Sequence, residues 1–191
     1  MTGGLIVAAP ASGSGKTVFT LGLLRHLAQS GVAVASAKAG PDYIDPAFHA
    51  AASGRPCLNL DPWAMRASTL AAAAGRLADD AEIIVCEGVM GLFDGATVSE
   101  GSTADLAELT GWPVALIIDA RAQAASAAAV LRGFAGHRPG VRIAGVVFNR
   151  IGGDRHAAIL REACALSLPE IPVIGSCSKL PTQTPTVRSG V

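Results

Sequence analysis

The chain has 191 residues, of which 50% are hydrophobic and 16% are charged, and its 15 basic residues balance its 15 acidic ones. This length suits one domain with a buried core, and the apolar content is too high for a disordered chain. A net charge of zero offers no excess of cations to a nucleic-acid backbone. The apolar runs are much shorter than the roughly 20 residues of a membrane-spanning helix. We therefore expect no nucleic-acid partner and no membrane partner.

The cysteines and the N-terminus point to a cellular compartment. Cys57, Cys86, Cys164 and Cys177 are widely spaced and form no CxxC pair. This spacing favours reduced thiols over a zinc site or a disulfide framework. The N-terminal residues carry no basic region ahead of their apolar run, so a signal peptide is not expected. These features predict a cytoplasmic protein.

Short apolar runs alternate with Ala/Leu-rich stretches of helical spacing along most of the chain. Continuous apolar runs are typical of parallel strands that are covered by helices on both faces. Strands are predicted at 5–9, 32–37, 83–86, 114–118, 143–148 and, weakly, 173–174. Helices are predicted at 17–29, 64–78, 103–110, 122–135 and 154–166. The alternation indicates an α/β fold with an open, mostly parallel sheet.

Two long loops and a polar tail interrupt this alternation. The loops at 38–62 and 87–102 are long for α/β connections, and long ordered loops are usually functional. Ser102 or Thr103 can cap the helix that follows the second loop, with Asp105 placed for a capping box. The segment 176–191 is polar and aperiodic. We predict one domain over 1–175 and an irregular, disordered tail over 176–191.

A small-residue turn stands between the first predicted strand and the first predicted helix. Small residues let consecutive backbone N–H groups curl around a phosphate, and the helix N-terminus adds donors and a partial positive charge. Pro10 stands where the GxxxxGK[ST] pattern has its first glycine, but the rest of the pattern is present. Lys16 would reach the β- and γ-phosphates of a nucleotide, and the Thr17 hydroxyl would ligate Mg²⁺. The expected nucleotide-binding residues are Ser12, Gly13, Ser14, Gly15, Lys16 and Thr17.

Acidic residues follow the second and third predicted strands, at the sheet edge where ligands of parallel α/β proteins bind. Glu87 directly ends the third strand and is the first candidate for a Mg²⁺ ligand. Asp42 and Asp45 are further candidates for the metal. Because they lie beside Pro41 and Pro46, the alternative is that they are turn residues.

Three other polar residues keep two interpretations each, and a fourth, Asn149, has one. Lys38 could bind an anionic substrate group or be a solvated loop lysine. His49 is more typical of a helix-face or capping histidine than of a catalyst. Asp119 could be a site residue or a helix cap. Asn149 ends the fifth predicted strand, where its amide could contact the edge of a nucleobase.

Several of these strings occur together, and in this order they resemble the cobyrinic acid a,c-diamide synthase family. The strings are APASGSGKT from residue 9, KAGPDYIDPAFH from residue 38, EGVMGLFDG from residue 87, and the segments 59–63, 101–107 and 144–150. The resemblance covers residues 4–175. It implies a P-loop NTPase-like open sheet with helices on both faces, related to that of dethiobiotin synthetase.

The resemblance also implies a reaction. Members of this family amidate the a- and c-side-chain carboxylates of cobyrinic acid, or of metal-free hydrogenobyrinic acid, during cobalamin biosynthesis. They use ATP, Mg²⁺ and ammonia drawn from glutamine. An ATP-dependent amide ligase with an acyl-phosphate intermediate is therefore expected, and Asp94 would position ammonia or the second carboxylate. The expected catalytic residues are Lys16, Asp45, Glu87 and Asp94, and the expected metal ligands are Thr17, Asp42, Asp45 and Glu87.

The chain departs from the family at its C-terminal side. Family members continue into a glutamine amidotransferase domain, which we expect to be absent here, so ammonia or a separate glutaminase would supply the nitrogen. One alternative is a non-catalytic nucleotide-binding fragment. Another is a partitioning-type ATPase switch, which Ala11 disfavours because such switches carry a signature lysine at that position. The sequence leaves a homodimer open.

Overall fold

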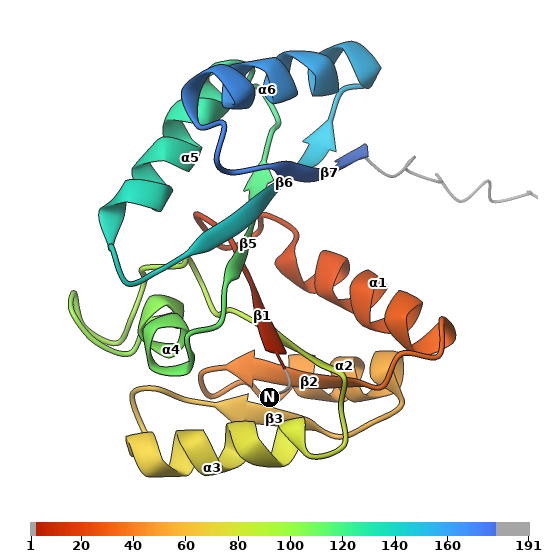
Figure 1. The fold of residues 1–191 in the computed structure, drawn as a ribbon, viewed down its shortest axis with the longest axis vertical. Helices are drawn as coiled ribbons and strands as arrows, with labels where there is room; N and C mark the ends of the chain where they lie inside the picture. The colour runs from red at the N-terminus through yellow and green to blue at the C-terminus, as the bar shows by residue number, and fades with distance from the viewer. Residues whose placement is uncertain (1–2, 179–191) are drawn as a thin grey trace, which may run out of the picture.

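A computed structural model describes residues 3–178 of the chain. Within this range one parallel sheet has the strand order β3-β2-β4-β1-β5-β6-β7 (Figure 1). Its strands are β1 (Gly3–Ala8), β2 (Val34–Ala39), β3 (Cys57–Leu60), β4 (Ile83–Glu87), β5 (Val114–Asp119), β6 (Ile143–Ile151) and β7 (Val173–Ser178). The helices are α1 (Lys16–Gln29), α2 (Asp45–Ser53), α3 (Ala67–Ala78), α4 (Thr103–Thr110), α5 (Ser126–His137) and α6 (Asp154–Ser167). The predicted α/β fold is confirmed.

Helices cover both faces of the sheet, and the central strand shows how. Ile6 and Ala8 of β1 belong to a large core that α3, α4, α5 and α6 complete. Val7 and Ala9 belong to a second core, which contains Leu24 of α1. Successive residues of a strand point to opposite faces, so a continuous apolar run is what this two-sided burial requires.

The structure corrects the loop that the sequence predicts at 38–62, because this segment contains α2 and β3. Pro46 lies in the first turn of α2, and Gly54 ends the helix in the left-handed conformation, with φ 74°. Proline fits the first helical turn and glycine fits such an end, so the local sequence favours this short helix. In β3, at the sheet edge, only Leu60 is buried, so its apolar pattern is weak.

The second long loop, which follows Glu87, is confirmed: no helix or strand occurs between residues 88 and 102. Its first part runs beside the phosphate loop, since the Gly88 N–H donates to the Val7 carbonyl and the Leu92 N–H to the Ala9 carbonyl. Its end is fixed by a capping box, in which Ser102 and Asp105 bind each other's backbone N–H groups at the start of α4. The loop is thus anchored at both ends.

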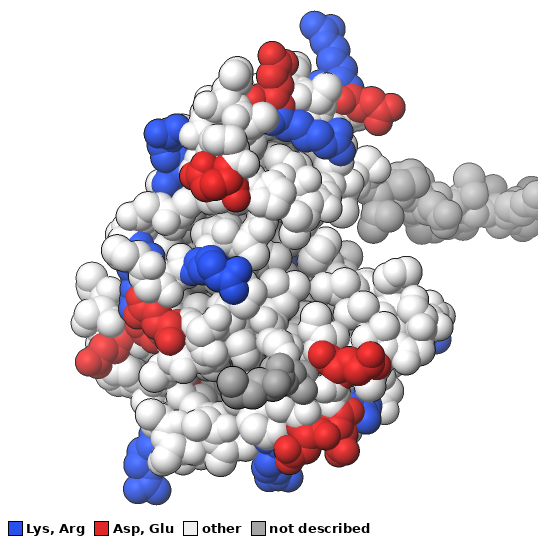
Figure 2. Space-filling view, viewed as in Figure 1, with Lys and Arg blue, Asp and Glu red and all other residues white. Residues whose placement is uncertain are grey.

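Strand β7 extends to Ser178, three residues beyond the domain end expected at 175. The rest of the expected tail lies outside the described residues. No helix within residues 3–178 is long and apolar enough to cross a membrane. All four cysteines are free. Figure 2 shows basic and acidic side chains interspersed around the rim of one face of the molecule, which agrees with the balanced charge of the chain.

Candidate functional site

The turn between β1 and α1 has the form of a phosphate-binding loop. Gly13 and Gly15 adopt positive φ angles of 77° and 97°, which favour glycine. A Cβ atom on Gly15 would lie 2.1 Å from the Asn149 amide nitrogen, so any other residue would displace the Asn149 side chain. Among the described residues, no side chain caps the N-terminus of α1. Its first N–H groups are therefore free to bind an anion.

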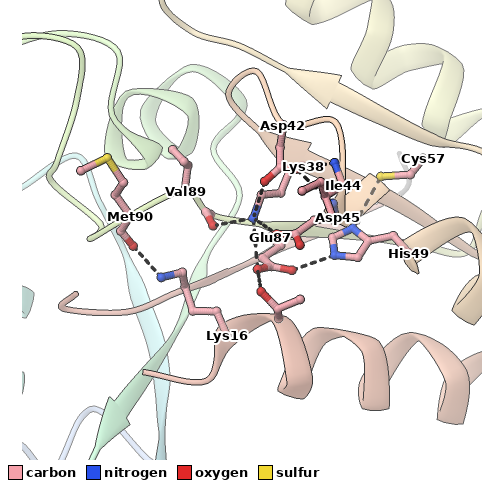
Figure 3. Close-up of polar contacts among 12 residues, drawn as sticks. Lys16, Lys38, Asp42, Ile44, Asp45, His49, Cys57, Glu87, Val89 and Met90 are labelled. Carbon is pink, nitrogen blue, oxygen red and sulfur yellow. Dashed lines mark hydrogen bonds and ion pairs between the residues drawn. The ribbon is translucent and has the colours of Figure 1, made fainter. Parts of the chain in front are cut away.

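Lys16 lies over this loop and is only 7% exposed. Its ammonium group donates a hydrogen bond of 2.6 Å to the Met90 carbonyl and one of 3.5 Å to the Ala11 carbonyl (Figure 3). Burial, together with the nearby positive charge of Lys38, lowers the pKa of Lys16. The Lys16 ammonium is thus held between the phosphate loop and the loop that follows β4.

Glu87 is fully buried and accepts hydrogen bonds on both carboxylate oxygens. Its Oε1 accepts from the Thr17 hydroxyl at 2.6 Å and from the Lys38 ammonium at 3.1 Å. Its Oε2 lies 2.7 Å from His49 Nε2. Burial alone would raise the pKa of Glu87, but the hydrogen bonds from His49 and Thr17 and the charge of Lys38 outweigh burial and lower it. The carboxylate is therefore ionised and faces Thr17.

Lys38 lies at the centre of the acidic residues and is 3% exposed. Its Nζ is 2.7 Å from Asp45 Oδ2 and 3.8 Å from Asp42 Oδ2, and it also donates to the Gly88 carbonyl at 3.3 Å. Burial would lower the pKa of Lys38, but the bonds with Asp45 and Glu87 raise it. The interpretation of Lys38 as a solvated lysine is thus wrong, because its ammonium is buried among carboxylates.

His49 lies on the inner face of α2 and is fully buried behind Glu87, so it is a helix-face residue and the capping interpretation is wrong. Its Nδ1 lies 3.5 Å from Cys57 Sγ of β3. Burial would lower the pKa of His49, but the bonds with Cys57 and Glu87 raise it to about 9. The only sequence signal for this role is that His49 follows Asp45 by one helical turn, on the helix that the sequence does not predict.

The two candidate aspartates differ in their surroundings. Asp42 Oδ1 accepts from the N–H groups of Ile44 and Asp45 at 2.8 and 3.0 Å, which is the geometry of a turn residue. Asp45 begins α2 and pairs with Lys38. Within residues 3–178, no group of three or more His, Cys, Asp or Glu side chains is placed to hold a metal. A metal here would thus need ligands beyond the carboxylates.

Asp94 lies in the loop after β4, and its carboxylate accepts from the Gly91 N–H at 2.9 Å. Its negative charge also acts on Lys16, which places the two groups in one electrostatic neighbourhood. Asp94 therefore shapes the turn beside the phosphate loop. Its role in positioning ammonia or a carboxylate remains a prediction.

The other side of the phosphate loop is held by residues near the C-terminal ends of β5 and β6. The Asn149 amide donates to the Ser14 carbonyl at 2.9 Å, and the Arg150 guanidinium donates to the Gly13 carbonyl at 2.8 Å. Arg150 also pairs with Asp119 at 2.6 Å. The structure thus assigns Asn149 and Arg150 to support of the loop, and the Asn149 contact with a nucleobase remains a prediction.

A groove of about 360 Å³ lies between this end of the sheet and α1. Val18, Phe19 and Leu23 of α1 give it an apolar side, and Asn149 lines it beside the phosphate loop. Its size and lining are suited to a flat, partly apolar group.

The model of the CobQ/CobB/MinD/ParA nucleotide binding domain matches residues 5–189 of this sequence. The chain belongs to this family. Among solved structures, chloroplast FtsY from Physcomitrella patens superposes with a TM-score of 0.62 at 18% identity, covering 91% of this chain and 57% of that one. Hydrogenase maturation factor HypB from Archaeoglobus fulgidus gives a TM-score of 0.58 at 14% identity, covering 92% and 81%. These likenesses support the P-loop NTPase fold.

Curated relatives confirm the resemblance that the motifs indicate. Hydrogenobyrinate a,c-diamide synthase from Rhizobium meliloti is 52% identical over 172 residues, which is 90% of this chain and 40% of that protein. The enzyme of the same name from Brucella anthropi is 54% identical over 174 residues, or 91% of this chain and 39% of that protein. The chain thus spans about two fifths of the length of these relatives and corresponds to their N-terminal part.

Proposed function

We propose that this chain is the ATP-binding amide-synthetase domain of a hydrogenobyrinate or cobyrinate a,c-diamide synthase. The observation that carries the proposal is the buried Glu87 carboxylate, which faces Thr17 at the end of a phosphate loop that Lys16 covers. The similarity to named diamide synthases over 90% of the chain supports the substrate class. A phosphate loop alone would indicate only nucleotide binding.

The residues present fit Mg-ATP. The free N–H groups at the start of α1 and the Lys16 ammonium would bind the β- and γ-phosphates. Thr17 and Glu87 would hold Mg²⁺ together with phosphate oxygens and water, a ligand set that Mg²⁺ commonly takes and that needs no preformed carboxylate cage. When bound, the ion offsets the negative charge of the phosphates. The groove beside Asn149 would take the adenine ring.

The reaction proceeds in two steps at this edge of the sheet. A substrate carboxylate oxygen bonds to the γ-phosphorus while the bond from that phosphorus to the β–γ bridging oxygen breaks, which gives ADP and an acyl phosphate. Ammonia then bonds to the acyl carbon, the carbon–oxygen bond to phosphate breaks, and a proton is lost, which leaves the amide. Lys16 and the loop amides stabilise the developing charge, and no protein nucleophile is required.

Exposed apolar side chains on the segments that carry the charged residues support a large ring substrate. Tyr43, Ile44 and Phe48 on and before α2, and Met90 in the loop after β4, are each more than half exposed. Met90 is also the residue whose carbonyl binds Lys16. A corrinoid has a wide apolar ring rimmed by carboxylates, so its ring would lie on these side chains while one carboxylate reaches the phosphates. Lys38 would then contact the substrate carboxylate, and Asp45 and Asp94 would contact ammonia.

The nitrogen source, a homodimer and a cytoplasmic location stay predictions. The partitioning-type switch gains no support from the site, because Ala11 contributes only its backbone carbonyl to Lys16. The non-catalytic fragment is an outcome of the experiment that follows.

The experiment is mass analysis of cobyrinic and hydrogenobyrinic acids after incubation with the protein and Mg-ATP, with either ammonium or glutamine. We expect a- and c-amides with ammonium, and the glutamine arm tests whether glutamine also serves as the nitrogen source. Lys16→Ala, as the matched control, should abolish turnover and leave the fold intact. Full activity of Lys16→Ala would overturn the proposed role of the loop. Nucleotide binding without amidation from either nitrogen source would leave a non-catalytic fragment.

A further inference from the structure

His49 is a buried titratable residue that has no role in the proposed reaction. It reaches Glu87 from α2 and lies 2.7 Å from Oε2, whereas Thr17 binds Oε1; Figure 3 shows the contact between His49 and Glu87. Thr17 and Lys38 bind only Oε1 of Glu87, whereas His49 is the described partner of Oε2. The orientation of the carboxylate therefore depends on His49.

The direction of this hydrogen bond follows from the chemistry of its partners. An ionised carboxylate only accepts hydrogen bonds, so His49 Nε2 must carry the proton that Glu87 Oε2 receives. The other ring nitrogen, Nδ1, faces Cys57 Sγ at 3.5 Å. A thiol can donate to Nδ1 of a neutral ring or accept from a charged one, so both charge states of His49 keep the proton on Nε2.

His49 has no nitrogen left for a substrate. One nitrogen is bound to Glu87, the other faces Cys57, and the ring is fully buried. A general acid or base must reach the proton that it moves. The geometry therefore excludes direct proton transfer and leaves an action through Glu87.

We propose that His49 is a positioning residue: its Nε2–H holds Oε2 of Glu87 so that Oε1 faces Thr17, while Cys57 Sγ contacts the other ring nitrogen. This inference rests on the proposed function, in which Glu87 and Thr17 hold Mg²⁺. Partners behind a metal-binding carboxylate restrict its rotation, and their loss typically weakens metal binding or activity by about 10- to 100-fold. Without His49, Oε2 would also be left buried without its hydrogen bond.

Two substitutions of His49 form a matched pair. The amide nitrogen of glutamine can occupy the place of Nε2, whereas that of asparagine reaches only the place of Nδ1. We expect His49→Asn to raise the Mg²⁺ concentration for half-maximal ATP binding by about 10- to 100-fold, and His49→Gln to recover most of this loss. Calorimetric titration of each full-length variant with Mg-ATP measures this, and thermal unfolding checks that both fold equally.

The same pair separates the inference from a merely structural role. Equal Mg²⁺ requirements in His49→Gln and His49→Asn would overturn the positioning role. It would also be overturned if the loss of Mg²⁺-dependent ATP binding in each variant only paralleled the fall in its melting temperature. If wild-type protein shows no Mg²⁺-dependent ATP binding, the proposed function fails as well. Mg²⁺-dependent binding in wild-type protein with no difference between the variants would overturn the positioning role alone.

A second measurement needs neither metal nor nucleotide and stays informative if the His49 variants misfold. Nitrogen-15 NMR of the imidazole in metal-free wild-type protein should show a protonated Nε2 for His49, with slow exchange of its proton. Cys57→Ser should keep this signal, since a hydroxyl can replace the thiol as donor and acceptor, and Cys57→Ala should weaken it. An unprotonated Nε2 in wild-type protein would overturn the inference.

Discussion

Glu87 and Asp119 occupy equivalent places on the two sides of the phosphate loop, yet their surroundings differ. Each ends a strand beside the central β1, Glu87 on β4 and Asp119 on β5. Glu87 is fully buried and bound by a hydroxyl, an ammonium group and an imidazole. Asp119 lies near solvent and pairs with Arg150 and with Arg121, whose side chain is 64% exposed.

This difference shows that place in the topology does not by itself fix a role. Glu87 accepts a hydrogen bond from Thr17, in the first turn of α1. Arg150, the partner of Asp119, instead binds the backbone of the phosphate loop. Removing one member of a buried charged group is costly, whereas exposed ion pairs contribute little. We therefore assign chemistry to the Glu87 side and support of the loop to the Asp119 side.

The largest expected effect comes from neutralising each carboxylate without changing its shape. Glu87→Gln should lower Mg-ATP-dependent amidation on the order of 100-fold or more, because the charge beside Thr17 is lost. Asp119→Asn should stay within roughly fivefold of wild type, since Asn149 still holds the loop. Initial rates of phosphate release at saturating substrate measure both. A larger loss in Asp119→Asn than in Glu87→Gln would reverse the assignment.

A smaller effect is expected on the free energy of unfolding. Glu87→Ala leaves buried Lys38 and His49 without their shared carboxylate, although Lys38 keeps Asp45, so we expect a loss of about 3 kcal/mol. Asp119→Ala should cost no more than about 1 kcal/mol. Urea unfolding at neutral pH measures both values. Equal losses would mean that the burial of Glu87 has no energetic consequence.

The smallest effect concerns the acid and salt response of Asp119. Partial burial would raise the pKa of Asp119, but the hydrogen bonds from Arg121 and Arg150 lower it below its ordinary value of 3.8. A lowered pKa contributes stability above the unfolded-state value, and that contribution is lost as pH falls through the folded-state value. The difference in stability between wild type and Asp119→Asn should thus be about 0.5 kcal/mol at pH 7.

That difference should shrink in 1 M salt, because exposed charges are screened there, and it should disappear in strong acid. Urea unfolding of the two proteins at pH 7, with and without salt, and again at acid pH gives the comparison. A difference that grows as the pH falls would contradict the sign of the pKa change.

The sequence predicts most of the sheet and half of the site. Strands β1 and β4 are nearly continuous apolar runs, so their hydrophobicity identifies them, and Glu87 directly ends β4. Lys38 and His49 are misread because their burial depends on α2, which begins at Asp45 inside an expected loop. Only the packing of this helix against α1, β2 and β3 brings His49 to Glu87, and a local sequence pattern does not reveal such a contact.

The order of the strands has a consequence for how the protein folds during synthesis. Strand β1 leaves the ribosome first and lies at the centre of the sheet, but Gly3 lies opposite Ile83 and Ile6 opposite Val114. The first strand therefore waits without sheet partners until β4 and β5 are made. Pairing over such separations is slow and leaves apolar segments exposed. The phosphate loop therefore gains its contacts with the loop after β4 and with Asn149 only after those later segments have been made.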